Sequence, residues 1–181
     1  QRSVKLETDF LRPNGLDGYV ISRLARDSVI RVLGALSMQN GNRAWSVIGP
    51  YGSGKSSFAA YLCALLADTS AESDAGRRLR ERWPEHATSV QTMLDGLDRP
   101  LVPVLITGQR APIGQIVLEA VKESASRFFA DSAVQPPVLI DLERMLTRVR
   151  DGKQVSDADV VSTICAYAKT VVNSNQASGV I

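Results

Sequence analysis

One stretch of the sequence, residues 49–56, constrains the fold more than any other. It reads GPYGSGKS and fits the pattern G-x-x-x-x-G-K-[ST] without a mismatch. Glycines let the backbone turn so that successive N–H groups point inward, where they bind phosphate oxygens. A lysine and a hydroxyl residue after the last glycine add a positive charge for the phosphates and a ligand for magnesium. The spacing therefore predicts a phosphate-binding loop.

Each part of this loop has an expected role. Its backbone is expected to cradle the β-phosphate, and Lys55 is expected to contact the β- and γ-phosphates as the catalytic residue. The Ser56 hydroxyl is the expected magnesium ligand. The predicted cofactors are ATP and Mg²⁺, and the sequence leaves GTP open. The predicted cofactor-binding residues are Gly49, Pro50, Tyr51, Gly52, Ser53, Gly54, Lys55, Ser56 and Ser57.

The flanks of the loop favour this interpretation over a glycine–serine turn that happens to contain a lysine. Residues 44–48 are short and mostly apolar, as in a buried parallel strand. After the loop, Phe58, Leu62 and Leu65 recur at helical spacing as far as Ala67. A strand, a loop and a helix are thus expected in the order that phosphate binding requires.

Residues 47–57 resemble the Walker A region of P-loop NTPases, and residues 44–58 resemble ATPase domains of large bacterial proteins, some encoded with phage-defence systems. The resemblance implies an additional-strand ATPase of AAA+ or STAND-like type. Its fold would be α/β, with three layers and a mainly parallel sheet. It also implies ATP hydrolysis coupled to conformational work in antiviral defence or nucleic-acid processing, with other protein subunits or nucleic acid as partners.

Length and composition indicate one α/β domain over residues 1–181. The chain is 44% apolar and 22% charged, and its net charge of +2 indicates no particular partner. No apolar run reaches membrane-spanning length and no signal peptide is recognisable, so a cytoplasmic protein without a membrane partner is expected. Cys63 and Cys165 form no C-x-x-C motif and are predicted to be buried thiols.

The domain is expected to have four parts. Residues 1–43 form a lead-in and a helix, residues 44–67 the strand, loop and helix, residues 68–100 a helical insertion, and residues 101–181 the rest of the core. The lead-in includes a short strand-like run at residues 4–6. The helix is expected from about Leu16, with an apolar stripe that includes Val29 and Leu33. In proteins of AAA+ type the segment before the first core strand often contacts the base. Tyr19 or Val20 is a candidate for that contact, although a helix that simply covers the sheet is favoured.

The arginine-rich segment at residues 77–82 has two interpretations. It is either a lid over phosphates or a solvated helix that turns Leu79 and Trp83 inward, and the helix is favoured. His86, which is the sole histidine, is interpreted as a surface residue.

A second apolar strand is predicted at residues 101–106, with Pro103 indicating an edge or a bulge. Arg110 follows it and is a weaker candidate for a phosphate contact. Pro112 is expected to open the next helix.

A nucleotide hydrolase also needs an acid after an apolar strand, and Asp141 is the candidate. A helix that begins after Pro136 and Pro137 is preferred for this segment, because the apolar residues continue at helical spacing. A further helix is predicted after a capping box at Ser156 and Asp159. Val180 and Ile181 are predicted to form a strand beside the core strands, at the position of a Walker B strand, but without its acid pair.

We therefore expect this chain to be the N-terminal portion of a longer ATPase. Because the chain alone lacks a convincing Walker B acid, its own enzymatic activity is left open. The alternatives are a small-molecule or nucleoside kinase, and a nucleotide-gated scaffold that hydrolyses little.

Overall fold

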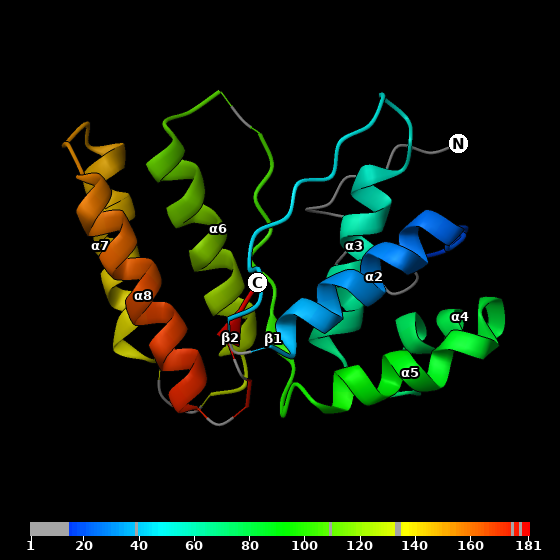
Figure 1. Ribbon diagram of the computed structural model, residues 1–181. Helices are drawn as coiled ribbons and strands as arrows, with labels where there is room; N and C mark the ends of the chain where they lie inside the picture. Colours follow the sequence, from blue (N-terminus) through cyan, green and yellow to red (C-terminus); the bar gives the residue numbers. More distant parts are fainter. Residues whose placement is uncertain (1–14, 39, 109, 133–134, 175, 178) are drawn as a thin grey trace. The chain divides into compact units, whose positions relative to one another are not determined.

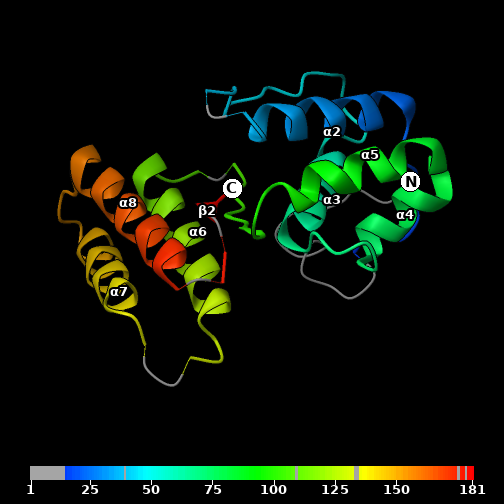
Figure 2. The ribbon, with the colours of Figure 1, turned by 60° about the horizontal axis from the view of Figure 1, so that its bottom comes forward.

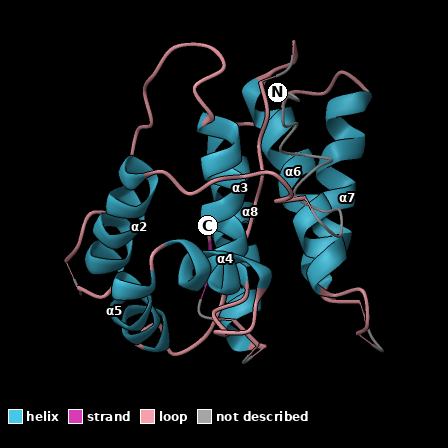
Figure 3. Ribbon diagram, turned by 90° about the vertical axis from the view of Figure 1, so that its right-hand side faces the viewer, coloured by secondary structure: helices cyan, strands magenta, loops and turns pink. Residues whose placement is uncertain are grey.

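The computed structural model describes residues 15–38, 40–108, 110–132, 135–174, 176–177 and 179–181. Over these residues the chain is mostly helical: seven helices account for 59% helix, and the sheet has two strands (Figure 1, Figure 3). The predicted three-layer α/β P-loop fold with a mainly parallel sheet is therefore wrong. The strand-like run predicted at residues 4–6 lies outside the described residues.

The two apolar runs that were predicted as core strands explain this difference. Residues 44–48 are exposed throughout and pair with no other strand among the described residues, and Ile48 is 91% exposed. The second run forms a strand only at Leu101–Val102 and stops before Pro103, which lacks the N–H group that would continue a ladder. An apolar, strand-like composition does not by itself produce a strand, because the N–H and C=O groups of a strand must hydrogen-bond to the backbone of a neighbouring strand.

Contacts within the chain cluster into two compact units, Gln1–Pro100 and Leu101–Ile181. The second unit begins at the residue where the second strand is predicted. Each unit is described by itself below.

Four helices make up most of the described part of the first unit (Figure 2). Helix α5 contacts both α2 and α4, and α3 contacts α4. The helices are α2 (Arg23–Leu36), α3 (Lys55–Ala67), α4 (Asp74–Arg82) and α5 (Pro84–Asp95). The core of this unit is formed by buried side chains from all four helices and from the segment before α2: Ile21, Val29, Leu33, Tyr61, Leu65, Leu66, Leu79, Val90 and Leu94.

Helix α2 begins later than the sequence pattern predicts. Its N-cap is Ser22, whose hydroxyl accepts a hydrogen bond of 3.2 Å from the Ala25 N–H. The expected start near Leu16 is instead a turn, in which Gly18 has a φ of 76°. Such a left-handed residue interrupts a helix and favours glycine. The buried side of α2 nevertheless follows the predicted apolar stripe through Val29 and Leu33.

The second unit packs three helices around one apolar core, beside the two strands (Figure 1). Helix α6 contacts both α7 and α8. The core includes Leu118 and Val121 of α6, Leu142 and Leu146 of α7, and Tyr167 of α8. The elements are β1 (Leu101–Val102), α6 (Ile113–Phe128), α7 (Pro137–Arg150), α8 (Asp157–Asn173) and β2 (Gly179–Val180).

Strands β1 and β2 are parallel, with Val102 opposite Val180. The pairing continues past β2, because the Ile181 N–H donates to the Val102 carbonyl at 2.9 Å and its own carbonyl accepts from Val104 at 2.6 Å. A strand at the end of the described chain was predicted, parallel with the strand that leads into the phosphate loop. The strand is present at Gly179–Val180, but its partner is β1 and residues 44–48 form no strand, so the predicted neighbour is wrong.

Two predicted helices in this unit are confirmed. Helix α7 starts at Pro137, one residue earlier than predicted, because a proline in the first turn lacks only an N–H that would have no partner there. Helix α8 starts with the predicted capping box, in which the Ser156 hydroxyl accepts from the Asp159 N–H and the Asp159 carboxylate accepts from the Ser156 N–H.

A buried polar group connects the strand side of this unit to two helices. The Ser124 hydroxyl on α6 donates to the Pro103 carbonyl at 2.8 Å and lies 2.9 Å from the Tyr167 hydroxyl on α8. Ser124 is 1% exposed and Tyr167 is fully buried. Buried polar atoms without partners are destabilising. The Ser124 hydroxyl therefore stabilises this unit by giving a partner to both the Pro103 carbonyl and the Tyr167 hydroxyl.

We predict that Ser124→Ala lowers the free energy of unfolding by about 1–3 kcal/mol, because it leaves the Pro103 carbonyl and the Tyr167 hydroxyl without this partner. Tyr167→Phe should cost about 1 kcal/mol, since the bond between Ser124 and Pro103 survives. Urea unfolding followed by circular dichroism measures both. Ser126→Ala, at an exposed position of the same helix, is the control, and a cost no larger than that of the control would contradict the prediction.

Candidate functional site

The loop at residues 49–56 has the backbone that its glycines allow. Gly52 and Gly54 have φ angles of 78° and 84°, in the left-handed region that other residues rarely adopt. Between them, the Ser53 N–H donates to the Pro50 carbonyl at 3.3 Å and closes a turn. A Cβ atom at Gly49 would lie 3.0 Å from the Ser53 hydroxyl oxygen, so a larger residue there would require the Ser53 side chain to move slightly. The backbone geometry therefore favours glycine at positions 52 and 54.

The Lys55 side chain folds back over this loop. Its Nζ atom donates to the carbonyls of Gly49 at 2.9 Å and Pro50 at 2.7 Å, and it lies 3.5 Å from the Ser53 hydroxyl oxygen. The ammonium group is therefore held against the loop by carbonyl dipoles rather than by a carboxylate. A bound anion would meet a full positive charge that no acidic side chain neutralises.

Helix α3 begins directly after the loop, and its first turn has no side-chain cap. Gly54 is the N-cap, its side chain offers no acceptor, and the first turn contains no acidic residue. Helices α2, α4 and α8 each have a serine cap instead. The first N–H groups of a helix have no partner within it, so the start of α3 presents unpaired donors together with the positive end of the helix dipole. A helix start of this kind favours an anion.

Two hydroxyl residues lie in this first turn of α3. Ser56 is exposed, Ser57 is partly buried, and the Ser56 hydroxyl makes no hydrogen bond within the described part of the chain. Tyr51, at the tip of the loop, is 97% exposed. The structure thus brings the predicted residues together in one loop and one helix turn, as their adjacency in the sequence requires.

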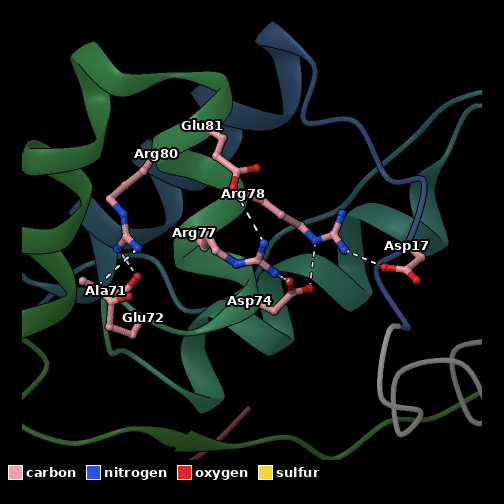
Figure 4. A network of polar contacts seen from close by, with 8 residues as sticks. All are labelled: Asp17, Ala71, Glu72, Asp74, Arg77, Arg78, Arg80 and Glu81. Carbon is pink, nitrogen blue, oxygen red and sulfur yellow. Dashed lines mark hydrogen bonds and ion pairs between the residues drawn. The ribbon is translucent and has the colours of Figure 1, made fainter.

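The arginines of α4 are engaged with acidic side chains (Figure 4). Arg78 donates to Asp74 at 2.8 Å and to Asp17, far away in the sequence, at 2.8 Å. Arg77 also pairs with Asp74 and lies 3.7 Å from Glu81. The hydrogen bond from Arg78, more than any other contact, lowers the pKa of Asp74.

Two further arginines of this segment also have partners. Arg80 pairs with Glu72 at 3.4 Å and with the Ala71 carbonyl, and the Arg82 guanidinium lies 5.6 Å from the centre of the Trp83 ring. The helix interpretation of residues 77–82 is confirmed, with Leu79 buried. A lid over phosphates needs arginines that are free to bind them, and these contacts leave little free positive charge.

Trp83 is surrounded by side chains from α2 and α5. The Arg26 guanidinium lies 4.4 Å from its ring centre, His86 stacks on it at 6.4 Å, and its indole N–H donates to the Ile21 carbonyl at 2.9 Å. Arg26 also forms two hydrogen bonds with Asp27. His86 is partly buried in this stack, which gives it a packing contact and no neighbouring nucleophile.

The two candidates for a base contact differ in exposure. Tyr19 packs against Tyr61 of α3 with ring centres 5.5 Å apart, and burial raises the pKa of Tyr19 to about 12. Val20 is 65% exposed. Neither residue lies in a helix. A contact between either residue and a base stays a prediction.

Asp141 is not at the end of a strand. It lies in α7, is exposed, and pairs with Arg144 at 3.1 Å. The helix interpretation of this segment is therefore confirmed. Over the described residues, no group of three or more His, Cys, Asp or Glu side chains is arranged to hold a metal ion. Arg110, the weaker candidate for a phosphate contact, is exposed and belongs to the second unit.

A shallow cavity of about 270 Å³ lies between α7 and α8. Its lining includes Arg144 and Arg148, one helical turn apart, with Ser162 and Ala166 of α8 among the other residues. Both arginines already have acceptors: Arg144 pairs with Asp141, and Arg148 lies 3.5 Å from the Gln154 carbonyl oxygen. Asp141 neutralises Arg144, so the positive charge of this lining is reduced, and the described lining residues include no glycine-rich loop that would add donors for an anion.

The two cysteines are free thiols in different environments. Cys63 lies on α3 and is partly buried, whereas Cys165 is exposed on α8, so the prediction of two buried thiols is wrong for Cys165. Burial raises the pKa of the Cys63 thiol to about 11. The raised pKa of Cys63 argues against an activated nucleophile at that position, which would need a lowered pKa.

Comparisons with known proteins add no assignment: no family model, no curated protein and no solved structure matches this chain. Of the helices in the described ranges, none combines the length and the apolar character needed to cross a membrane.

Sequence reasoning missed the contacts that hold the site's surroundings in place. The pairing of Asp17 with Arg78 joins residues 61 positions apart, and the bond from Trp83 to Ile21 joins residues 62 apart. No periodicity or motif marks such pairs. The contact of Lys55 with the carbonyl of Gly49 is also absent from the pattern, although both residues belong to it.

We predict that Asp141→Asn leaves the magnesium dependence of ATP binding unchanged, because Asp141 pairs with Arg144 on the surface of α7. The change should alter the free energy of unfolding by less than about 1 kcal/mol, as expected for an exposed ion pair. Titration calorimetry with and without Mg²⁺ provides the test. Loss of magnesium dependence in this variant would mean that Asp141 is a metal ligand.

We predict that iodoacetamide at pH 8 modifies Cys165 rapidly and Cys63 slowly. With its pKa raised to about 11, the Cys63 thiol has only about one thiolate in a thousand at this pH. The Cys63 rate should increase as the pH is raised toward 11, since deprotonation produces the reactive form. Peptide mass spectrometry over time separates the two sites, and equal rates at pH 8 would contradict the assignment.

Proposed function

We propose that residues 49–56 bind the triphosphate of ATP together with Mg²⁺. The observation that carries the proposal is the Lys55 ammonium group, which is held at 2.7–2.9 Å from two loop carbonyls and pairs with no carboxylate of the described residues. In the proposed complex this ammonium exchanges carbonyl contacts for oxygens of the β- and γ-phosphates. The backbone N–H groups from Gly52 to Ser56 supply the remaining donors.

The proposed complex is favourable on electrostatic grounds. Charge-assisted hydrogen bonds contribute about 1.5–3 kcal/mol each, and a helix start adds about 0.3–1 kcal/mol for an anion. Because Gly52 and Gly54 already have left-handed φ angles, the loop needs little reordering on binding. The uncapped first turn of α3 loses no internal hydrogen bond when a phosphate binds to it.

Magnesium enters the proposal through Ser56. Its hydroxyl is exposed, lies one residue after Lys55, and is a hard oxygen ligand of the kind that Mg²⁺ accepts. A Mg²⁺ ion usually keeps several waters and takes one or two protein ligands in addition to phosphate oxygens. One serine hydroxyl is therefore a sufficient protein contribution for binding.

Hydrolysis requires more than these residues. Attack on the γ-phosphate needs a group that positions water, and no described carboxylate is hydrogen-bonded to the loop residues. The proposal for this chain is therefore nucleotide binding. ATP hydrolysis coupled to conformational work in bacterial defence or nucleic-acid processing stays a prediction that depends on such an acid. A nucleotide-gated scaffold needs only the binding step.

We predict that Lys55→Ala weakens Mg–ATP binding by about 10- to 100-fold or more, because it removes a charge-assisted contact to the phosphates. The helices should be unaffected, since the Lys55 side chain contacts only its own loop. Titration calorimetry measures the affinity and circular dichroism the helix content. Lys169→Ala, an exposed lysine on α8, is the matched control. Unchanged ATP affinity in Lys55→Ala would refute the proposed site.

We predict that Ser56→Ala removes most of the benefit that Mg²⁺ gives to ATP binding and leaves metal-free binding almost unchanged. The hydroxyl is the proposed metal ligand, while the backbone N–H groups that bind phosphate remain. The comparison needs ATP titrations with Mg²⁺ and with a chelator for both the parent and the variant. Ser89→Ala, at an exposed position on α5, controls for loss of a hydroxyl elsewhere. If magnesium strengthens binding equally in Ser56→Ala and the parent, Ser56 is not the ligand.

A further inference from the structure

We draw no further inference here: the strongest candidate, the exposed apolar segment at residues 44–48 that leads into the phosphate loop, carries none because nothing in the described residues shows what covers it.

Discussion

The structure depends on the requirement that backbone N–H and C=O groups find partners. A helix satisfies this requirement within one segment, whereas a strand needs a second strand. The segments from Lys55 to Ala67 and from Pro137 to Arg150 have local sequence signals, and both form helices. Residues 44–48 have the composition of a strand but no described partner, and they form no strand and stay exposed. Among the described residues, β1 and β2 are the two strands that pair, and they do so in parallel over two residues each.

The candidate site lies where backbone N–H groups lack hydrogen-bond partners. At the start of α3 the first N–H groups have no partner within the helix, and Gly54 provides no side chain to cap them. Lys55 adds a charge whose contacts in the described chain are the carbonyls of Gly49 and Pro50 and the Ser53 hydroxyl. Unpaired donors and an uncompensated cation in one loop make an anion the natural ligand. The unpaired N–H donors and the Lys55 charge support the proposal of phosphate binding, and this support does not depend on the rest of the fold.

Several arginines of the described chain have carboxylate partners. Arg78 binds both Asp74 and Asp17, and Arg144 binds Asp141. An ion pair near the surface adds little to stability, but it does occupy donors of the guanidinium group. This difference in partners separates Lys55 from Arg78 and Arg144.

The sequence by itself determined the features that depend on neighbours within a few residues. The left-handed glycines of the loop, the helix after Lys55, the helix start at Pro137 and the capping box at Ser156 all follow from local spacing. Tertiary structure decided which apolar runs become strands, because a ladder depends on a partner far along the chain. It also decided that Cys165 is exposed and that Arg78 meets Asp17. Such outcomes depend on how separate segments pack, and no short-range pattern contains that information.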